Sequence, residues 1–108
     1  MARPITPEDL KTLLAGNEKP AVFDVRRRGD FEAAPQTISR AVWLDPEKAD
    51  DWSDEIPRDR PIVVYCVKGG SVSQSIAEKL EQGHANVRFL QGGIKAWVEA
   101  GERVEEDR

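Results

Sequence analysis

The stretch Ile62–Leu80, which reads IVVYCVKGGSVSQSIAEKL, decides the fold. Its first four residues, 62–65, are apolar and three of them are β-branched, which predicts a short strand buried on both faces, as in a parallel sheet. Apolar residues then recur at helical spacing, at Val72, Ile76 and Leu80, with charged residues between them. The stretch therefore predicts a buried strand, a tight turn and an amphipathic helix.

Cys66, the only cysteine of the chain, falls on the turn between this strand and this helix. Gly69 and Gly70 follow, and we expect Ser71 to cap the helix. Glycines let successive N–H groups converge on one point, and a helix N-terminus adds a positive dipole end, so a thiolate held there is stabilised as a nucleophile. Lys68 adds a positive charge. The alternative interpretation is that Cys66 is a small apolar residue that ends a core strand. The order of strand, cysteine, basic residue, two glycines and amphipathic helix favours a reactive thiol instead.

The length of the chain, 108 residues, predicts a single domain with one modest hydrophobic core. We expect this domain to span residues 1–101 and residues 102–108 to form a charged, frayed tail. The net charge of -4 and the pI of about 5.0 argue against nucleic-acid binding and against attraction to anionic membranes.

No apolar segment approaches the length of a transmembrane helix, and the first residues lack the apolar region of a signal peptide. A single cysteine excludes an internal disulfide and suits a reducing compartment. These features predict a cytoplasmic protein.

The first elements carry clear local signals. Thr6 is a good N-cap, Pro7 suits the first helical position, and Gly16 is predicted to end that helix. A very short strand ending at Ile5 precedes it, and residues 21–25 read as the first buried strand.

Three arginines follow the strand over residues 21–25. Asp24 lies inside that strand, and a buried carboxylate needs partners, so we assign Arg26 to a structural ion pair rather than to substrate contact. Arg27 and Arg28 are assigned to a solvated loop.

The remaining chain alternates strands and helices. We predict a helical turn at 30–34, a strand at 41–44, a helix from Asp45 to Trp52, a strand at 87–90, and a helix that presents Ile94, Trp97 and Val98 on one face and ends at Gly101. His84 is interpreted as an exposed loop residue, and the sequence offers no second histidine or cysteine for a metal site. This alternation predicts an α/β fold with a parallel sheet and helices on both faces.

Four pieces of sequence, in this order and spacing, resemble the rhodanese-like domain family over nearly the full chain. They are Thr6-Pro7-Glu8-Asp9-Leu10; Asp24-Val25-Arg26 followed by Phe31; Ile62-Val63-Val64-Tyr65-Cys66 with its glycine-bearing loop; and Leu90-Gln91-Gly92-Gly93-Ile94-Lys95-Ala96-Trp97 followed by Ala100-Gly101.

The resemblance implies a single-domain rhodanese, with a small central parallel sheet and Cys66 as the nucleophile that carries sulfur. It implies ping-pong transfer of a sulfane sulfur from a small anion such as thiosulfate, through a Cys66 persulfide, to cyanide or a thiol. The active-site loop would comprise Val67, Lys68, Gly69, Gly70 and Ser71, whose amides stabilise the anionic sulfur. No metal or organic cofactor is implied, and with no second cysteine the persulfide cannot be resolved within the chain.

The chain departs from the common family pattern at two places. Ser71 stands where many members have an arginine, five positions after the cysteine, so Lys68 is the only cation inside the loop. Residues 37–41 read Thr-Ile-Ser-Arg-Ala where His-Ile-x-Gly-Ala is usual. The loop is similar to that of a subset of bacterial rhodanese-like proteins found in chromate-resistance clusters.

Two other functions stay open at this point. Phosphatases of this fold use a Cys-x5-Arg loop, but Val72 occupies the arginine position, so the guanidinium that would hold phosphate is missing. The other possibility is a non-catalytic module that carries a persulfide or binds a partner protein.

Overall fold

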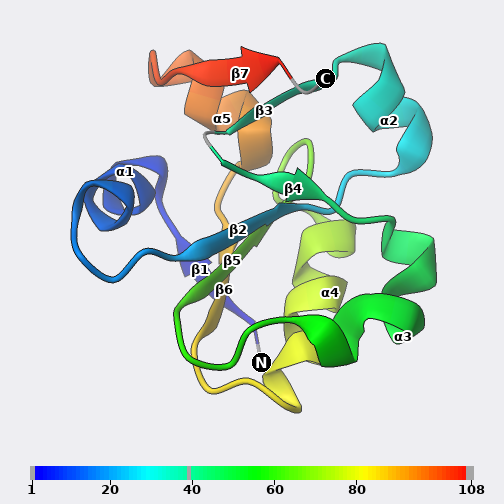
Figure 1. Ribbon diagram of the computed structural model, residues 1–108. Coiled ribbons are helices and arrows are strands. Elements are labelled where there is room, and N and C mark those ends of the chain that lie inside the picture. The colour runs from blue at the N-terminus through cyan, green and yellow to red at the C-terminus, as the bar shows by residue number, and fades with distance from the viewer. Residues whose placement is uncertain (1, 39, 107–108) are drawn as a thin grey trace.

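A five-stranded parallel sheet with helices on both faces forms the body of the protein, which confirms the predicted α/β fold (Figure 1). The structure is a computed structural model that describes residues 2–38 and 40–106. The strands of this sheet are β1 (Arg3–Ile5), β2 (Ala21–Asp24), β4 (Val42–Trp43), β5 (Ile62–Tyr65) and β6 (Val87–Leu90). The helices are α1 (Pro7–Ala15), α2 (Arg28–Ala33), α3 (Ala49–Trp52), α4 (Ser71–Glu81) and α5 (Gly93–Glu99), with 3-10 turns at Pro46–Lys48 and Ser53–Glu55.

Strand β5 lies at the centre of the sheet, whose order is β1-β6-β5-β2-β4. Ile62 and Val64 belong to the hydrophobic cluster on one face, and Val63 and Tyr65 belong to the cluster on the other. Because both faces of β5 are covered, all four of its residues are buried.

The helices divide between the two faces of the sheet. Leu10 of α1 and Trp97 of α5 pack with Val63 on one face. Ala49 of α3 and Leu80 of α4 pack on the other face (Figure 1). The C-terminal ends of β2 and β5 therefore lie between two helical layers, at the edge of the sheet where parallel α/β folds bind ligands.

The helix caps agree with the prediction at α1 but not at α4. The Thr6 side chain accepts a hydrogen bond from the amide of Asp9 at 3.1 Å, and Pro7 takes the first helical position. At α4 the N-cap is Gly70, and Ser71 is the first helical residue, so the prediction that Ser71 caps the helix is wrong. Helix α4 therefore begins one residue earlier than predicted, at Ser71, and the loop between Cys66 and the helix is one residue shorter.

The expected frayed tail contributes a strand instead. Strand β7 (Val104–Glu106) pairs antiparallel with β3 (Gln36–Ile38), which sequence analysis did not predict. The indole Nε1 of Trp97 donates a hydrogen bond to the carbonyl of Arg103 at 2.9 Å and fixes the approach to this strand. Asp107 and Arg108 lie outside the described residues.

His84 is buried rather than exposed, because its ring fills a space between α4 and the loop before β5. Only 8% of the residue is exposed. Its two ring nitrogens lie 3.0 Å from the carbonyl oxygens of Leu80 and Ile56. The imidazole thus lies between the end of α4 and the loop, and its N–H group has a carbonyl acceptor on either side.

Helix α5 buries only part of the face predicted for it. Ile94 and Trp97 are buried, as predicted, but Val98 is 51% exposed. Val98 lies beside an open groove that Val104 of β7 also lines, so no element covers its side chain among the residues described.

Candidate active site

Cys66 follows the last residue of β5, at the C-terminal end of the central strand. Only 6% of the residue is exposed, and it lines a pocket of about 330 Å³. The described residues that line this pocket with it are Arg26, Arg27, Asp30, Val67, Lys68, Gly70, Ser71 and Val72. We call it the Cys66 pocket. The thiol is therefore buried in the fold yet borders a cavity large enough for a small anion.

Four of the five loop residues predicted to accompany Cys66 line this pocket, and Gly69 does not. Gly69 is buried on the other side of the loop, against the turn that precedes α5. Its φ is +72°, a left-handed conformation that favours glycine. Of the two loop glycines, Gly69 is thus the one that the fold requires to be glycine.

Helix α5 fixes the first two peptide groups of the loop. The amide of Ile94 donates to the carbonyl oxygen of Cys66 at 2.9 Å, and that of Lys95 donates to Val67 at 3.0 Å. In a trans peptide the N–H group points opposite to the C=O group, so the amides of Val67 and Lys68 point away from α5. None of the described residues of α5 lines the Cys66 pocket. Both loop amides are therefore held in a fixed direction, away from α5.

Helix α4 fixes the next part of the loop. The side-chain amide Nε2 of Gln74 donates to the carbonyl oxygen of Gly69 at 2.9 Å, and the backbone amide of Gln74 donates to Gly70 at 3.2 Å. The loop is thus held from both helical layers, and its backbone is ordered before any ligand binds.

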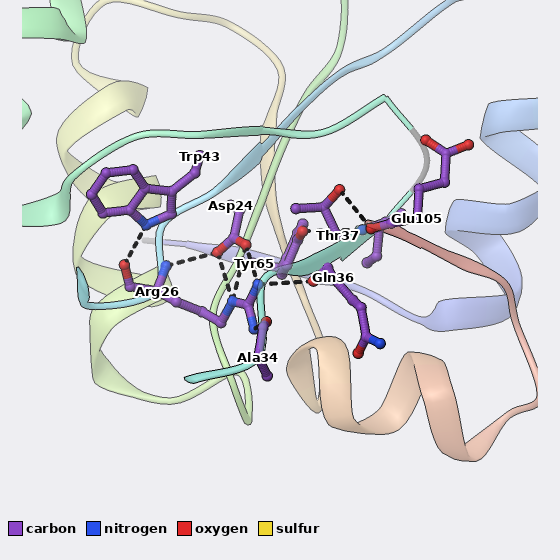
Figure 2. Close-up of polar contacts among 9 residues, drawn as sticks. Asp24, Arg26, Ala34, Gln36, Thr37, Trp43, Tyr65 and Glu105 are labelled. Atoms are coloured by element: carbon purple, nitrogen blue, oxygen red, sulfur yellow. Dashed lines mark hydrogen bonds and ion pairs between the residues drawn. The ribbon is translucent and has the colours of Figure 1, made fainter. Parts of the chain in front are cut away.

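Arg26 forms the ion pair that sequence analysis assigned to it (Figure 2). Its Nη2 lies 2.6 Å from Oδ2 of Asp24, and its Nε lies 2.9 Å from the same oxygen. Its remaining donors reach the carbonyl oxygens of Ala34 at 2.8 Å and Gln36 at 2.9 Å. Each nitrogen of the guanidinium has a protein partner, and the bonds to Ala34 and Gln36 fix the chain before β3. Arg26 also forms part of the wall of the Cys66 pocket.

Tyr65, the residue before Cys66, extends this buried polar network. Its hydroxyl oxygen accepts a hydrogen bond from the amide of Ile38 at 3.1 Å. Burial, with the nearby Asp24 carboxylate as a second cause, raises the pKa of Tyr65 well above its ordinary value. Tyr65 stays neutral at any physiological pH and serves as a fixed link between β5 and β3.

Arg27 and Arg28 are both exposed, as predicted, but Arg28 is the first residue of α2 rather than part of a loop. Arg28 lies over the ring of Trp43, with its guanidinium carbon 5.1 Å from the ring centroid. Arg27, however, lines the Cys66 pocket, which its position in the sequence alone did not indicate.

Ser73 is the residue near Cys66 that sequence analysis missed. Its hydroxyl oxygen lies 3.2 Å from the Sγ atom of Cys66, and the residue is fully buried. The sequence holds a weak signal for it, because Ser73 is a polar residue on the helical face that otherwise carries Ile76, Ala77 and Leu80.

A family model described as the rhodanese-like domain matches residues 6–100. The chain belongs to the rhodanese-like domain family. Cys66, its loop and the Asp24–Arg26 pair all fall within the matched residues.

Relatives of this rhodanese-like domain carry sulfurtransferase names. A protein of Allochromatium vinosum named sulfurtransferase is 35% identical over 103 residues, which cover 94% of this chain and 92% of that protein. A protein of Coxiella burnetii named thiosulfate sulfurtransferase GlpE is 36% identical over 77 residues, which cover 70% of this chain and 69% of that protein.

The fold of the rhodanese-like domain also matches solved structures. A rhodanese-related protein from Thermoplasma volcanium superposes with a TM-score of 0.83 at 27% identity, over 97% of this chain and 99% of that one. Within residues 2–38 and 40–106, no helix is long and apolar enough to cross a membrane. The same residues contain no group of three or more His, Cys, Asp or Glu side chains placed to hold a metal ion.

We expect Gly69→Ala to destabilise the protein and displace the loop. A Cβ atom at Gly69 would lie 2.6 Å from the amide nitrogen of Gly92 and 2.8 Å from the carbonyl oxygen of Leu90, both backbone atoms that cannot rotate away. The left-handed conformation alone costs about 1–2 kcal/mol for alanine, and the clash adds to it. Urea denaturation measures the loss. Gly70→Ala is the matched control, because a Cβ there meets no atom within 4 Å, and equal stability of the two variants would contradict the prediction.

Proposed function

We propose that this rhodanese-like protein is a sulfurtransferase that carries sulfur as a persulfide on Cys66. The observation that supports this best is the position of its only cysteine, at the end of the central strand beside a pocket whose loop amides are preoriented. The sulfurtransferase names of relatives at 35% and 36% identity support the same activity. A free reactive thiol suits the cytoplasm, where thiols stay reduced.

In the first step the Cys66 thiolate attacks the outer sulfur of a donor such as thiosulfate. A bond forms between Sγ and that sulfur, the sulfur–sulfur bond of the donor breaks, and its electron pair leaves with sulfite. Cys66 then carries a persulfide whose negative charge lies on the outer sulfur. The amides of Val67 and Lys68, which point away from α5, are placed to stabilise this charge.

In the second step an acceptor, cyanide or a thiolate, attacks the outer sulfur. The bond between Sγ and the outer sulfur breaks, and the electron pair returns to Sγ as the thiolate. Since the chain has no second cysteine, the acceptor must come from another molecule. The kinetics are therefore ping-pong.

The charge around the Cys66 pocket suits a small anion. Arg27 and Lys68 are exposed cations on its wall, and Asp30 is the acidic residue among those that line it. Arg26 also lines the pocket, but its charge is balanced by Asp24. The excess of positive charge favours an anionic donor, although the chain lacks the loop arginine of many relatives.

Intact mass spectrometry of the wild-type protein tests the proposal. Mixing with thiosulfate should add the mass of one sulfur atom, and subsequent cyanide should remove it and release thiocyanate. Stoichiometric loading without repeated turnover would instead identify a persulfide carrier. Absence of any loading from thiosulfate or another sulfane donor would overturn the proposal in favour of a binding module.

We expect Lys68→Ala to raise the KM for thiosulfate by up to about fivefold with a smaller change in kcat, because an exposed ion pair contributes only about 0.2–1 kcal/mol. Loss of ground-state binding has this kinetic signature. Steady-state thiocyanate assays at low and high salt measure it, and the difference from wild type should shrink as salt screens the charge.

Lys48→Ala is the control for the change in net charge, since Lys48 is also exposed, in the turn before α3, and does not line the Cys66 pocket. Equal KM values for the Lys68 and Lys48 variants would show that the Lys68 ammonium does not meet the donor.

A further inference from the structure

The Cys66 sulfur has a single side-chain hydrogen-bond partner among the described residues, the hydroxyl group of Ser73. The Sγ and Oγ atoms lie 3.2 Å apart, within hydrogen-bond distance for sulfur. The same hydroxyl lies 3.5 Å from the carbonyl oxygen of Gly70, one turn back at the start of α4. Ser73 therefore connects the reacting atom to the helix that begins at the end of the loop.

The position of Ser73 is unusual for a serine. It is fully buried, on the face of α4 that otherwise packs Ile76, Ala77 and Leu80 against the sheet. A buried hydroxyl without a partner is unfavourable by about 1–3 kcal/mol, so a packing role would be better served by alanine. The two partners that the hydroxyl does have are the Cys66 sulfur and the Gly70 carbonyl.

We propose that Ser73 is a catalytic residue whose hydroxyl stabilises the negative charge on the Cys66 sulfur by reversing its hydrogen bond. When Cys66 is a thiol, S–H donates to Oγ and the hydroxyl donates to the Gly70 carbonyl. When the thiol proton has left to solvent, the hydroxyl turns and donates to the thiolate. This role rests on the proposed sulfur transfer and identifies a group that acts in it.

The contact acts most directly in the second step. In the persulfide the charge lies on the outer sulfur, Sγ is neutral, and the hydroxyl can donate to Gly70. As the acceptor attacks, the sulfur–sulfur bond breaks and its electron pair comes to rest on Sγ. The Ser73 hydroxyl then donates to the departing thiolate, while its proton stays on the serine oxygen throughout. Ser73 thus stabilises a leaving group whose charge develops in the transition state.

The charged groups around Cys66 do not substitute for this contact. Of the charged residues that line the pocket, Arg27, Asp30 and Lys68 are exposed, and the buried Arg26 is paired with Asp24. Ser73 reaches the sulfur from α4 inside the protein, where a hydrogen bond to a charged atom is worth more than in water. Since all four charged groups remain in a Ser73 variant, a change in reactivity reports on the hydroxyl.

The test compares Ser73→Ala with Ser73→Thr, which keeps a hydroxyl, and with Ser75→Ala, which removes an exposed serine from the same helix. Loading by thiosulfate and discharge by cyanide are measured separately in single turnovers. The rate of Cys66 alkylation by iodoacetamide is measured from acid to alkaline pH. Ser73→Val, which has the shape of the threonine variant without its hydroxyl, serves as a second variant if Ser73→Ala does not fold.

In Ser73→Ala the discharge rate should fall about tenfold or more, since a hydrogen bond to a charged group contributes about 1.5–3 kcal/mol. Loading should change less at alkaline pH, and the pH of half-maximal alkylation should rise by about one unit. Ser73→Thr should recover much of the discharge rate, and Ser75→Ala should match wild type.

An unchanged discharge rate and alkylation profile in folded Ser73→Ala would overturn the assignment. The alkylation profile needs no sulfur transfer. If the wild-type protein fails to load sulfur, the proposed function fails, while a shifted alkylation profile still demonstrates the Ser73–Cys66 contact.

Discussion

Cys66→Ala should lose all thiosulfate:cyanide transfer while keeping the native fold. Alanine removes the only sulfur nucleophile in the chain, so neither loading nor discharge has an atom to act on. The change deletes one buried atom beside Ser73 and leaves the carbonyl of residue 66 bonded to α5, so the free energy of unfolding should fall by only about 1 kcal/mol.

Circular dichroism and urea denaturation establish that the variant is folded, and intact mass with a thiocyanate assay measures transfer. Cys66→Ser is a matched variant that keeps a polar atom at the site and should be equally inactive. Transfer that survives in either folded variant would rule out Cys66 as the sulfur carrier.

The wild-type sample should release no phosphate from an aryl phosphate, because Val72 replaces the arginine that a phosphatase of this fold requires.

Asp24→Asn should destabilise the protein by about 3–5 kcal/mol, because removing one partner of a buried ion pair leaves an uncompensated charge. The side chains of Asp24 and Arg26 are 0% and 3% exposed, so solvent screens this pair very little. Asparagine keeps the size of the aspartate and isolates the effect of charge. The Arg26 guanidinium would lose its counterion while still bound to the carbonyls of Ala34 and Gln36.

Urea denaturation measures this loss. Glu32→Gln is the control, because Glu32 pairs with Arg28 at the surface, where both side chains are more than half exposed. An exposed pair contributes about 0–1 kcal/mol, so the control should unfold at nearly the wild-type urea concentration. A similar small effect in both variants would show that the Asp24–Arg26 pair does not stabilise the fold.

The elements that sequence analysis predicted well are those with strong local signals. Thr6 and Pro7 define the start of α1 by capping chemistry, and the apolar run at 62–65 defines β5 by its uniform burial. In each case the residues that carry the signal are the ones that form the contact, so short-range reasoning suffices.

The elements that it missed depend on contacts between distant segments. Strand β3 and strand β7 each have three residues, and neither pattern predicts a strand until the two are brought together. His84 is buried because carbonyls from α4 and from residue 56 both face it. Nothing near residue 84 in the sequence identifies the second of these partners.

The candidate site divides in the same way. Cys66 and its glycine-bearing loop were predictable, because a strand, a cysteine and a helix start are adjacent in the sequence. The bonds from α5 to the loop were not, since they require β6 to be the neighbour of β5 in the sheet. Ser73 became recognisable only when the rotation of α4 placed its hydroxyl at the sulfur.

The close approach of Gly69 to Gly92 has a consequence for the evolution of this chain. Each glycine has a positive φ, and the backbone nitrogen of Gly92 occupies the space that a side chain at position 69 would need. A larger residue at position 69 would be tolerated only after the turn at position 92 had moved, so substitutions at the two positions are epistatic. The reactive loop can therefore diversify at Gly70, which has open space around it, while Gly69 and the distant turn change only together.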